Sequence, residues 1–330
     1  MNNSDQRTAG AKSAGNNAAK IRKPAFLSLA ILITGLAVTG CSSLPTSESP
    51  KSASSLFYEK SKIIHEIGGS PENAEEAHEQ GDAAVVRGDR DQALYFYVKA
   101  LEFNEEGQEA LYKIGTIHAD KGTSDVAKMA FRMVLDLSPK HAGALEGMGL
   151  IQLKNHHHVD AIESLRAAVQ ADRNRWRAHN GLGLLADLRE DFADATSHYE
   201  AAMKLKPNSP MLLNNCGYSK YLSGDWDDAQ QLYENALRIN PGSEQTWLNL
   251  GLLHARRGND QAALQAFRRV VTEADAYNNV GYINMMDGKY EEAESYFMRA
   301  ISLSPSYHAT AQENLKRMES MRDHEALSEQ

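Results

Sequence analysis

Small, bulky and again small side chains recur along most of the chain at one fixed interval. Glycines stand 34 residues apart from Gly81 to Gly251. Twelve residues after the first of them comes Ala93, four further on Tyr97 and three further on Ala100, and each later unit repeats these classes of side chain. Spacings of four and three place residues on one face of a helix. Each interval therefore predicts two antiparallel helices joined by a short turn, with the bulky residue between layers.

A seventh unit keeps this internal spacing but begins early. Its glycine, Gly281, follows Gly251 by 30 residues, so that "NNCGYSKYLSGDWDDA" returns as "NNVGYINMMDGKYEEA" after 64 residues. Four residues are missing between Val270 and Gly281, which is close to one helical turn of about 3.6 residues. We expect nearly the same helix face on a displaced layer, with a local change of superhelical curvature before Asp275.

Residues that end helices stand where this pattern needs them. Glycine adopts the left-handed conformation of a helix end without the cost of a Cβ atom, and proline cannot continue a helix. The glycines predicted to end first helices are Gly88, Gly122, Gly224, Gly258 and Gly288. The prolines predicted to stop second helices are Pro139, Pro207, Pro241 and Pro305.

Both ends of such a stack need a cover, because a terminal unit otherwise exposes an apolar face. Residues 308–322 predict a capping helix at the end, and residues 56–73 predict a helical segment that covers the front. Residues 323–330 predict a polar, frayed tail. The apolar residues of the two covers are Phe57, Ile63, Ile64 and Ile67 at the front and Ala311, Leu315 and Met318 at the end.

Four position classes that agree over seven units resemble the tetratricopeptide repeat (TPR), whose period is also 34 residues. The resemblance covers residues 74–307 and implies an all-α superhelical solenoid of about seven helix-turn-helix repeats with a C-terminal capping helix. The TPR domain is expected over residues 74–322. Its units are 74–107, 108–141, 142–175, 176–209, 210–243, 244–273 and 274–307.

Composition excludes two broad classes of protein. The 330 residues are 42% hydrophobic, which is ample for a globular core and too apolar for general disorder. The formal net charge is −9, so the composition lacks the excess of basic residues that is typical of a nucleic-acid-binding protein.

The N-terminus has a composition of its own. Residues 1–23 are basic, and residues 24–40 form an uncharged apolar run that ends in small residues. This pattern predicts a secretory signal; the alternative is a transmembrane anchor, which needs about 20 apolar residues. The run ends in "VTGC", which resembles the bacterial lipobox and implies that residues 1–40 are removed and Cys41 is lipidated.

The lipobox resemblance also implies a location. Ser42 after the lipidated cysteine suggests the outer membrane, by similarity to the enterobacterial sorting rule. Residues 41–55 are rich in serine and proline and predict a flexible tether. We therefore expect a chain held at the outer membrane through the Cys41 lipid anchor and facing the periplasm.

No residues stand out as a catalytic, cofactor or metal site. "GLGLLA" matches a dinucleotide fingerprint but falls inside a predicted first helix, where that motif does not bind. The adjacent His156, His157 and His158 cannot converge on one ion as an i, i+4 pair would, and predict a solvated turn. Cys216 replaces leucine or valine of sister units, which predicts a buried apolar residue. The sequence predicts neither an enzyme nor a cofactor.

Side chains that packing does not require suggest a peptide-binding groove. Three asparagines stand two positions before the glycines of units five to seven, where TPR superhelices face their concave groove. A side-chain amide can both donate to and accept from a peptide backbone. Aromatic and methionine side chains nearby would add an adaptable apolar surface. The predicted groove residues are Asn215, Asn249, Asn279, Tyr218, Tyr221, Tyr282, Met211, Met285 and Met286.

The alternative is that asparagine here belongs only to the repeat consensus. Units three and four carry Gly147 and Gly181 at this place, so a clamp would not run along the whole array. The clamp hypothesis predicts that replacing Asn215, Asn249 and Asn279 together with alanine weakens partner binding with little loss of fold.

The combination of lipobox, serine-rich tether and TPR array resembles the TadD-type lipoproteins of Flp (Tad) pilus assembly. The last unit, "VGYINMMDGKYEEAESYFMRAISLSPSYHATAQENLKRM", adds to this resemblance. It implies a scaffold that binds protein partners, such as the pilus secretin or other assembly components. The alternatives are a pilotin-like lipoprotein for another secretin and an adaptor for periplasmic proteases or peptidoglycan enzymes.

Overall fold

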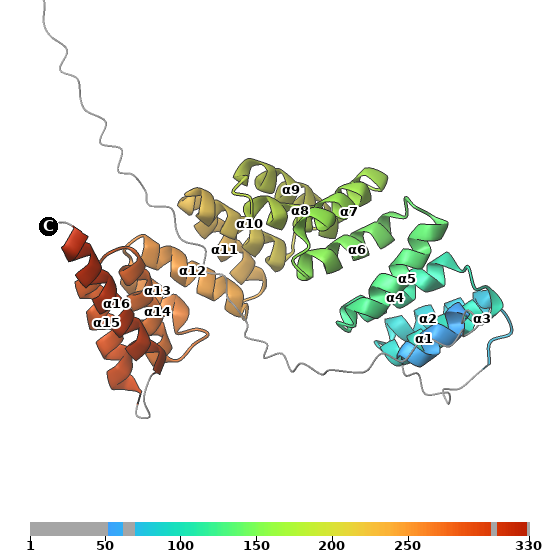
Figure 1. Cartoon of the computed structure of the whole chain (residues 1–330), viewed down its shortest axis with the longest axis horizontal. Helices are drawn as coiled ribbons and strands as arrows, with labels where there is room; N and C mark the ends of the chain where they lie inside the picture. The colour runs from blue at the N-terminus through green and yellow to red at the C-terminus, as the bar shows by residue number, and fades with distance from the viewer. Residues whose placement is uncertain (1–51, 62–69, 305–308, 329–330) are drawn as a thin grey trace, which may run out of the picture. The chain divides into compact units, whose positions relative to one another are not determined.

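The computed structural model describes residues 52–61, 70–304 and 309–328, which form sixteen α-helices and no strand (Figure 1). The prediction of an all-α helical-repeat fold is confirmed. The predicted leader, Cys41 and most of the tether lie outside the described residues, as do Pro305 and the three isoleucines of the front cover. No helix of the described segments is long and apolar enough to cross a membrane.

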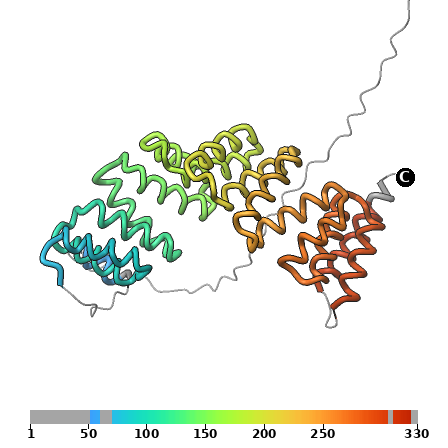
Figure 2. Tube along the Cα trace, turned by 180° about the vertical axis from the view of Figure 1, so that it is seen from behind, coloured from blue at the N-terminus to red at the C-terminus, as the bar shows by residue number. Residues whose placement is uncertain are grey.

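Helices α2 to α15 follow one another as seven pairs, and the two helices of each pair pack together (Figures 1 and 2). The first helices are α2 (Ala74–Val86), α4 (Gln108–Asp120), α6 (Ala142–Lys154), α8 (Trp176–Asp187), α10 (Pro210–Ser223), α12 (Glu244–Arg256) and α14 (Glu273–Met286). The second helices are α3 (Arg90–Phe103), α5 (Ser124–Leu137), α7 (His158–Ala171), α9 (Phe192–Leu205), α11 (Trp226–Ile239), α13 (Asp260–Phe267) and α15 (Tyr290–Leu303).

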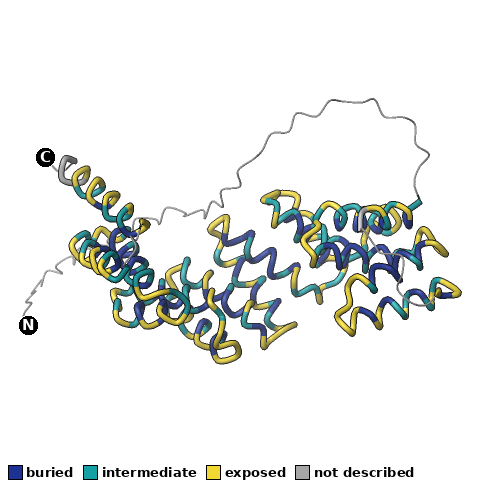
Figure 3. Tube along the Cα trace, turned by 90° about the horizontal axis from the view of Figure 1, so that it is seen from below, coloured by how far each residue is buried: buried dark blue, intermediate teal, exposed yellow. Residues whose placement is uncertain are grey.

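The repeat glycine recurs because a ring or branched side chain from the second helix occupies the space of its Cβ atom. A Cβ atom on Gly115 would lie 2.6 Å from the Phe131 ring, and one on Gly183 would lie 2.7 Å from the Tyr199 ring. Both rings are buried, and the buried positions follow the inner sides of the helices (Figure 3). The bulky residue of each unit thus fills the space between helices at the density of a packed core.

The turns between the helices of a pair use the left-handed backbone conformation. Gly224, for example, ends α10 at φ 89°. Units three and four lack this glycine and force His156 and Glu190 into the same region, at φ 60° and 58°. This conformation is strained for a residue with a Cβ atom and unstrained for glycine.

The seventh unit follows a shortened helix. The helix α13 has 8 residues, whereas the other second helices have 14. The chain leaves the helix after Phe267, and α14 begins at Glu273 with Thr272 as its N-cap. The irregularity therefore falls at the predicted junction, and the change of curvature stays a prediction.

Helices at both ends run beyond the predicted covers. The helix α1 (Ala53–Ser61) begins inside the predicted tether, because Ala53 and Phe57, one turn apart, are buried with residues of the front units. The helix α16 (Ala309–Ser328) packs on α15 and continues past residue 322. The helix thus extends to Ser328, into the predicted tail of residues 323–330, and the expectation that this tail frays stays a prediction.

Candidate partner-binding surface

The first helices of successive units lie side by side and share one exposed face. The helix α4 packs on α6, and this contact repeats from α6 to α8, α10, α12 and α14. Four positions of each first helix lie on one side of it: six and two residues before the repeat glycine, and one and five residues after it. They do so because steps of four and three residues return to the same side of a helix. We call these positions in all seven units the first-helix face.

The first-helix face carries an apolar row over five successive units. One position after the repeat glycine stand Leu150, Leu184, Tyr218, Leu252 and Tyr282. None of these residues is fully buried, and Tyr218 is 38% exposed. Five positions after the glycine, three units add Leu188, Leu222 and Met286. A continuous, partly exposed apolar row with polar neighbours is typical of a surface that binds a protein partner.

The first-helix face is hollowed where α4, α6 and α8 meet. A cavity of about 270 Å³ lies there, and Gly147, Leu150 and Lys154 are among the residues that line it. Glu146 is 7% exposed at the same place, and burial raises the pKa of its carboxyl although Arg175 acts in the opposite direction. The Phe131 ring occupies the space that a Cβ atom on Gly147 would need, so this wall of the cavity is formed by the ring against the glycine backbone.

Two of the three predicted clamp asparagines bind asparagines of the preceding unit. The amide nitrogen of Asn215 donates to the side-chain oxygen of Asn180 at 2.9 Å, and that of Asn249 donates to Asn214 at 3.0 Å. The side-chain oxygen of Asn249 also accepts from Gln245 at 3.1 Å. We call these bonds the asparagine ladder. Because buried amides need such partners, the ladder gives Asn215 and Asn249 a structural role.

The ladder stops at the junction between units six and seven. By register, Asn279 would donate to the residue that corresponds to Asn214 in unit six, but that residue is Leu248. The half-buried Asn279 side chain accordingly makes no hydrogen bond with the described residues. Its neighbour Asn278 accepts from Asn314 of α16 at 2.9 Å. Of the three asparagines, Asn279 alone keeps its full hydrogen-bonding capacity for a partner within the described part of the chain.

Unit five carries the aromatic part of the predicted surface. The rings of Tyr218 and Tyr221 stack with their centroids 5.8 Å apart. Met211 lies on the same helix and is 46% exposed. Burial raises the pKa of Tyr221, although Arg256 of the next unit acts in the opposite direction. Met211 and Tyr218 are therefore exposed to a partner, and the Tyr221 ring, packed against the core of units five and six, supports Tyr218.

The capping helix changes the roles of the residues predicted in unit seven. Met285 is fully buried together with Phe297 and Met318, so its assignment to the groove is wrong. Tyr282 and Met286 remain partly exposed and pack against the same cluster. The Tyr282 hydroxyl is buried without a hydrogen-bond partner among the described residues. The cause is α16, which covers the last layer as a further unit would.

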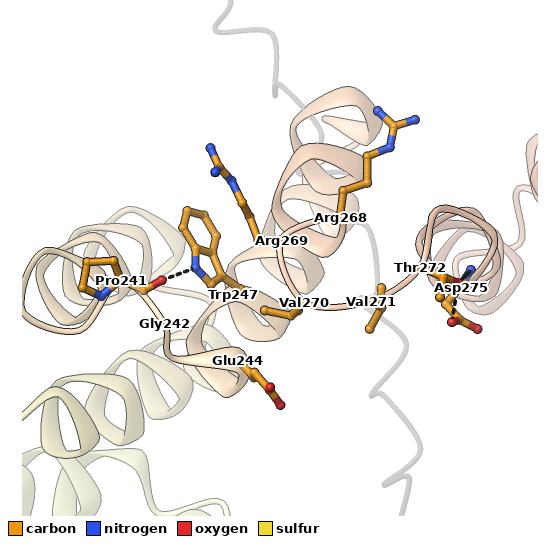
Figure 4. Close-up of a pocket in the computed structure, with 10 residues that line it drawn as sticks. All are labelled: Pro241, Gly242, Glu244, Trp247, Arg268, Arg269, Val270, Val271, Thr272 and Asp275. Atoms are coloured by element: carbon orange, nitrogen blue, oxygen red, sulfur yellow. Dashed lines mark hydrogen bonds between the residues drawn. The ribbon is translucent and has the colours of Figure 1, made fainter.

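The early end of α13 opens a second cavity, of about 930 Å³, between the loops that precede α12 and α14 (Figure 4). Arg269 lies beside the Trp247 ring, with its guanidinium carbon 5.4 Å from the ring centroid (Figure 4). The indole N–H donates to the carbonyl of Pro241 at 2.8 Å. Val270 and Val271, which leave the helix after Phe267, form part of the wall. This cavity adjoins the junction at which the ladder stops.

Comparisons with known proteins agree with this geometry. Three family models, each described as tetratricopeptide repeat, match residues 108–141, residues 146–210 with 217–278, and residues 274–307. Together they cover more than half of the chain. The chain belongs to the tetratricopeptide-repeat family. A comparison with curated proteins found no match.

Solved structures share the TPR fold at low sequence identity. A TPR protein from Parabacteroides merdae is 19% identical with a TM-score of 0.51, over 74% of this chain and 98% of that one. PilF of Pseudomonas aeruginosa is 17% identical with a TM-score of 0.50, over 75% and 97%. A chain of the Cut9–Hcn1 hetero-tetramer of the APC/C is 18% identical with a TM-score of 0.53, over 80% of this chain and 51% of that one. At these identities the likeness shows the fold alone.

The described part of this TPR array offers no group of three histidine, cysteine or acidic side chains that could hold a metal ion. "GLGLLA" lies within the first helix α8, as its sequence position predicts. His156 and His157 lie in the turn before α7, and His158 is its first residue. Cys216 is buried, and burial raises the pKa of its thiol to about 11. A thiol in this state is a packing residue and a poor nucleophile.

Sequence analysis missed the partners that hold the TPR layers together. Asn180 and Asn214 accept the ladder bonds, and both stand three positions before a repeat glycine. Asp187 was missed as well; its carboxylate accepts from Tyr199 at 2.8 Å and from Ser219 of the next unit at 2.6 Å. The recurrence of asparagine three positions before the glycine was the signal that could have revealed the ladder.

Proposed function

We propose that this TPR chain is a lipid-anchored scaffold of the outer membrane that holds a protein partner on its first-helix face during Flp/Tad-type pilus assembly. The observation that carries the binding role is the apolar row from Leu150 to Tyr282, which five successive units leave partly exposed. The location and the pilus role rest on the leader, Cys41 and the resemblance to TadD-type lipoproteins.

The first-helix face suits binding better than chemistry. Burial of apolar surface contributes about 25 cal/mol per Å², so side chains such as Tyr218 and Met211 can each stabilise a complex. Aromatic and methionine side chains adapt to partners of different shape. Asn279, whose side chain makes no hydrogen bond with the described residues, adds an amide that can hydrogen-bond to a partner backbone.

A photo-crosslinker that replaces Tyr218 tests the binding surface in intact cells. Met298 on the second helix α15 is 58% exposed and provides the matched control position. We expect a crosslink from position 218 to a component of the pilus machinery and none from position 298. Equal capture from both positions, or capture of no partner from position 218, contradicts the proposal.

Replacement of Cys41 tests the anchor. Cys41→Ala should move the protein from the membrane fraction to the soluble periplasmic fraction, because one apolar chain or more is lost from the membrane. Cys216→Ala is the matched control, since it removes the other cysteine and leaves the predicted lipid site intact. Membrane retention of Cys41→Ala shows that another attachment dominates.

A further inference from the structure

The first-helix face changes its charge between units two and three. In units one and two it carries five acidic residues and a single base, Lys113. In units three to seven the only acid is Asp275, and the bases are Lys154, Arg177 and Arg256. The acidic residues of the front are Glu75, Glu79, Asp82, Glu109 and Asp120. The face therefore presents an acidic front and an apolar, weakly basic remainder.

Four of the five acidic residues of the front converge on one cavity. Glu75, Glu79, Asp82 and Glu109 line a hollow of about 520 Å³ between the first two units. Among the described residues, Lys113 is the only lysine or arginine paired with them, at 3.0 Å from Asp82 and 3.7 Å from Glu109. Glu75 and Glu79 are exposed, and neither pairs with a cation among the described residues. A cationic side chain of a partner can pair with the carboxylates of Glu75 and Glu79 here.

The first-helix face of units three to seven favours apolar side chains of a partner over cationic ones. Leu150, Leu184 and Tyr218 present apolar surface in three adjacent units, and Leu252 and Tyr282 continue the row. Lys154 and Arg177 make no ion pair with the described residues, and the first-helix face of units three to six carries no acid, so these units add no carboxylate on that face for a basic segment. The amides that could grip an extended backbone are engaged in the asparagine ladder at units five and six. Recognition on this part of the face therefore depends on apolar side chains of the partner.

We propose that the first-helix face binds a partner segment with a basic end followed by an apolar body. Its lysine or arginine side chains enter the acidic cavity of units one and two, and its apolar side chains lie on the row from Leu150 toward Tyr282. The charge difference along the face fixes the direction in which the segment lies. This inference rests on the proposed binding function and adds the chemistry of the partner.

Selection of random 16-residue peptides on the purified chain tests this chemistry without assuming a partner. We expect the selected peptides to carry lysine or arginine at one end and apolar residues in the remainder. Selection of acidic or uncharged peptides, or of no peptide, overturns the inference.

Variants then locate the two ends of a selected peptide. Glu75→Gln with Glu79→Gln should lower its affinity about tenfold, because two unpaired carboxylates are lost next to its basic end. The matched control is Glu163→Gln with Glu200→Gln, which removes the same charge from exposed positions of second helices and should leave the affinity unchanged. Equal affinity for both double variants contradicts the basic end.

Tyr218→Ala separates the two proposals. If Tyr218→Ala lowers the affinity for the selected peptide and the double variant Glu75→Gln with Glu79→Gln does not, the first-helix face is the binding surface but the predicted basic end of the partner is wrong. If Tyr218→Ala has no effect and the crosslinker at position 218 captures no partner, the first-helix face is not the binding surface and both proposals fall.

Discussion

The asparagine ladder allows structural and binding roles to be separated with two single substitutions. Asn249 is 7% exposed and donates to the side-chain oxygen of Asn214, which is 8% exposed. That oxygen accepts no other hydrogen bond from the described residues. Asn249→Ala leaves this buried acceptor without a donor, at a cost of about 1–3 kcal/mol in the free energy of unfolding. Alanine favours the helix over asparagine by up to about 0.7 kcal/mol, which offsets part of this cost. The expected net loss is about 0.3–3 kcal/mol.

Asn279→Ala is the matched variant, because the residue stands at the same place of the next unit and makes no side-chain bond within the described chain. We expect its free energy of unfolding to stay the same or to rise slightly through helix propensity. Its affinity for a partner peptide should fall, since the free amide is removed.

Urea unfolding followed by far-UV circular dichroism gives the comparison, and the same peptide titration gives the affinities. The structure also changes the expectation for the triple alanine variant, which should lose stability at Asn215 and Asn249 as well as binding. Equal losses of stability in Asn249→Ala and Asn279→Ala, or no loss in either, would refute the structural role of the ladder.

Four further predictions concern the array itself. His156→Gly should raise the free energy of unfolding by about 0.5–1 kcal/mol, because the residue has φ 60°; a lower unfolding midpoint contradicts this. Burial lowers the pKa of His118 to about 4, so the unfolded chain binds more protons below about pH 6.5, and stability should fall by about 1.4 kcal/mol per pH unit from there toward pH 4. His118→Gln should remove that part of the pH dependence measured by urea unfolding. Cys216 should react with a thiol reagent at pH 8 only in denaturant, and rapid labelling of the native chain would show that it is accessible. Amides of α14 should exchange with deuterium faster than those of α12, because the junction before α14 has a shorter helix and no ladder bond; equal protection argues against a weak junction.

Local residue patterns were enough to predict the repeat fold. The glycine and the bulky residue of each unit contact each other within one helix pair, as Gly115 and Phe131 do. Their spacing along the chain was therefore enough to predict the contact. The turn glycines act on their own backbone and are equally local. Such features depend on neighbours within one period, which a single sequence displays repeatedly.

Contacts between units were harder to predict because they depend on register across layers. Asn215 seemed free for a ligand until its partner Asn180, 35 residues away, was located in the structure. Met285 lies at the surface of an isolated unit but is buried because α16 covers the last layer. The end of α16 was missed because polar residues after 322 gave no apolar spacing to follow. In each case a distant element decides the burial or the bonding of the residue.

One junction unites the irregular features of this array. The loss of four residues before Gly281 accompanies a second helix of 8 residues in place of 14, and the residues that no longer fit into α13 line the cavity beside Trp247. Leu248 at the same junction removes the acceptor for Asn279. In a repeat array, stability is the sum of terms for each unit and for each interface between neighbours. The missing ladder bond at this single interface should therefore lower the stability of the last unit and its cap without affecting the interfaces before it, although apolar residues such as Phe267 and Val280 still pack across it. A partner that contacts both Tyr218 and Asn279 would bridge this interface and supply the hydrogen bond that Asn279 does not make with the described residues.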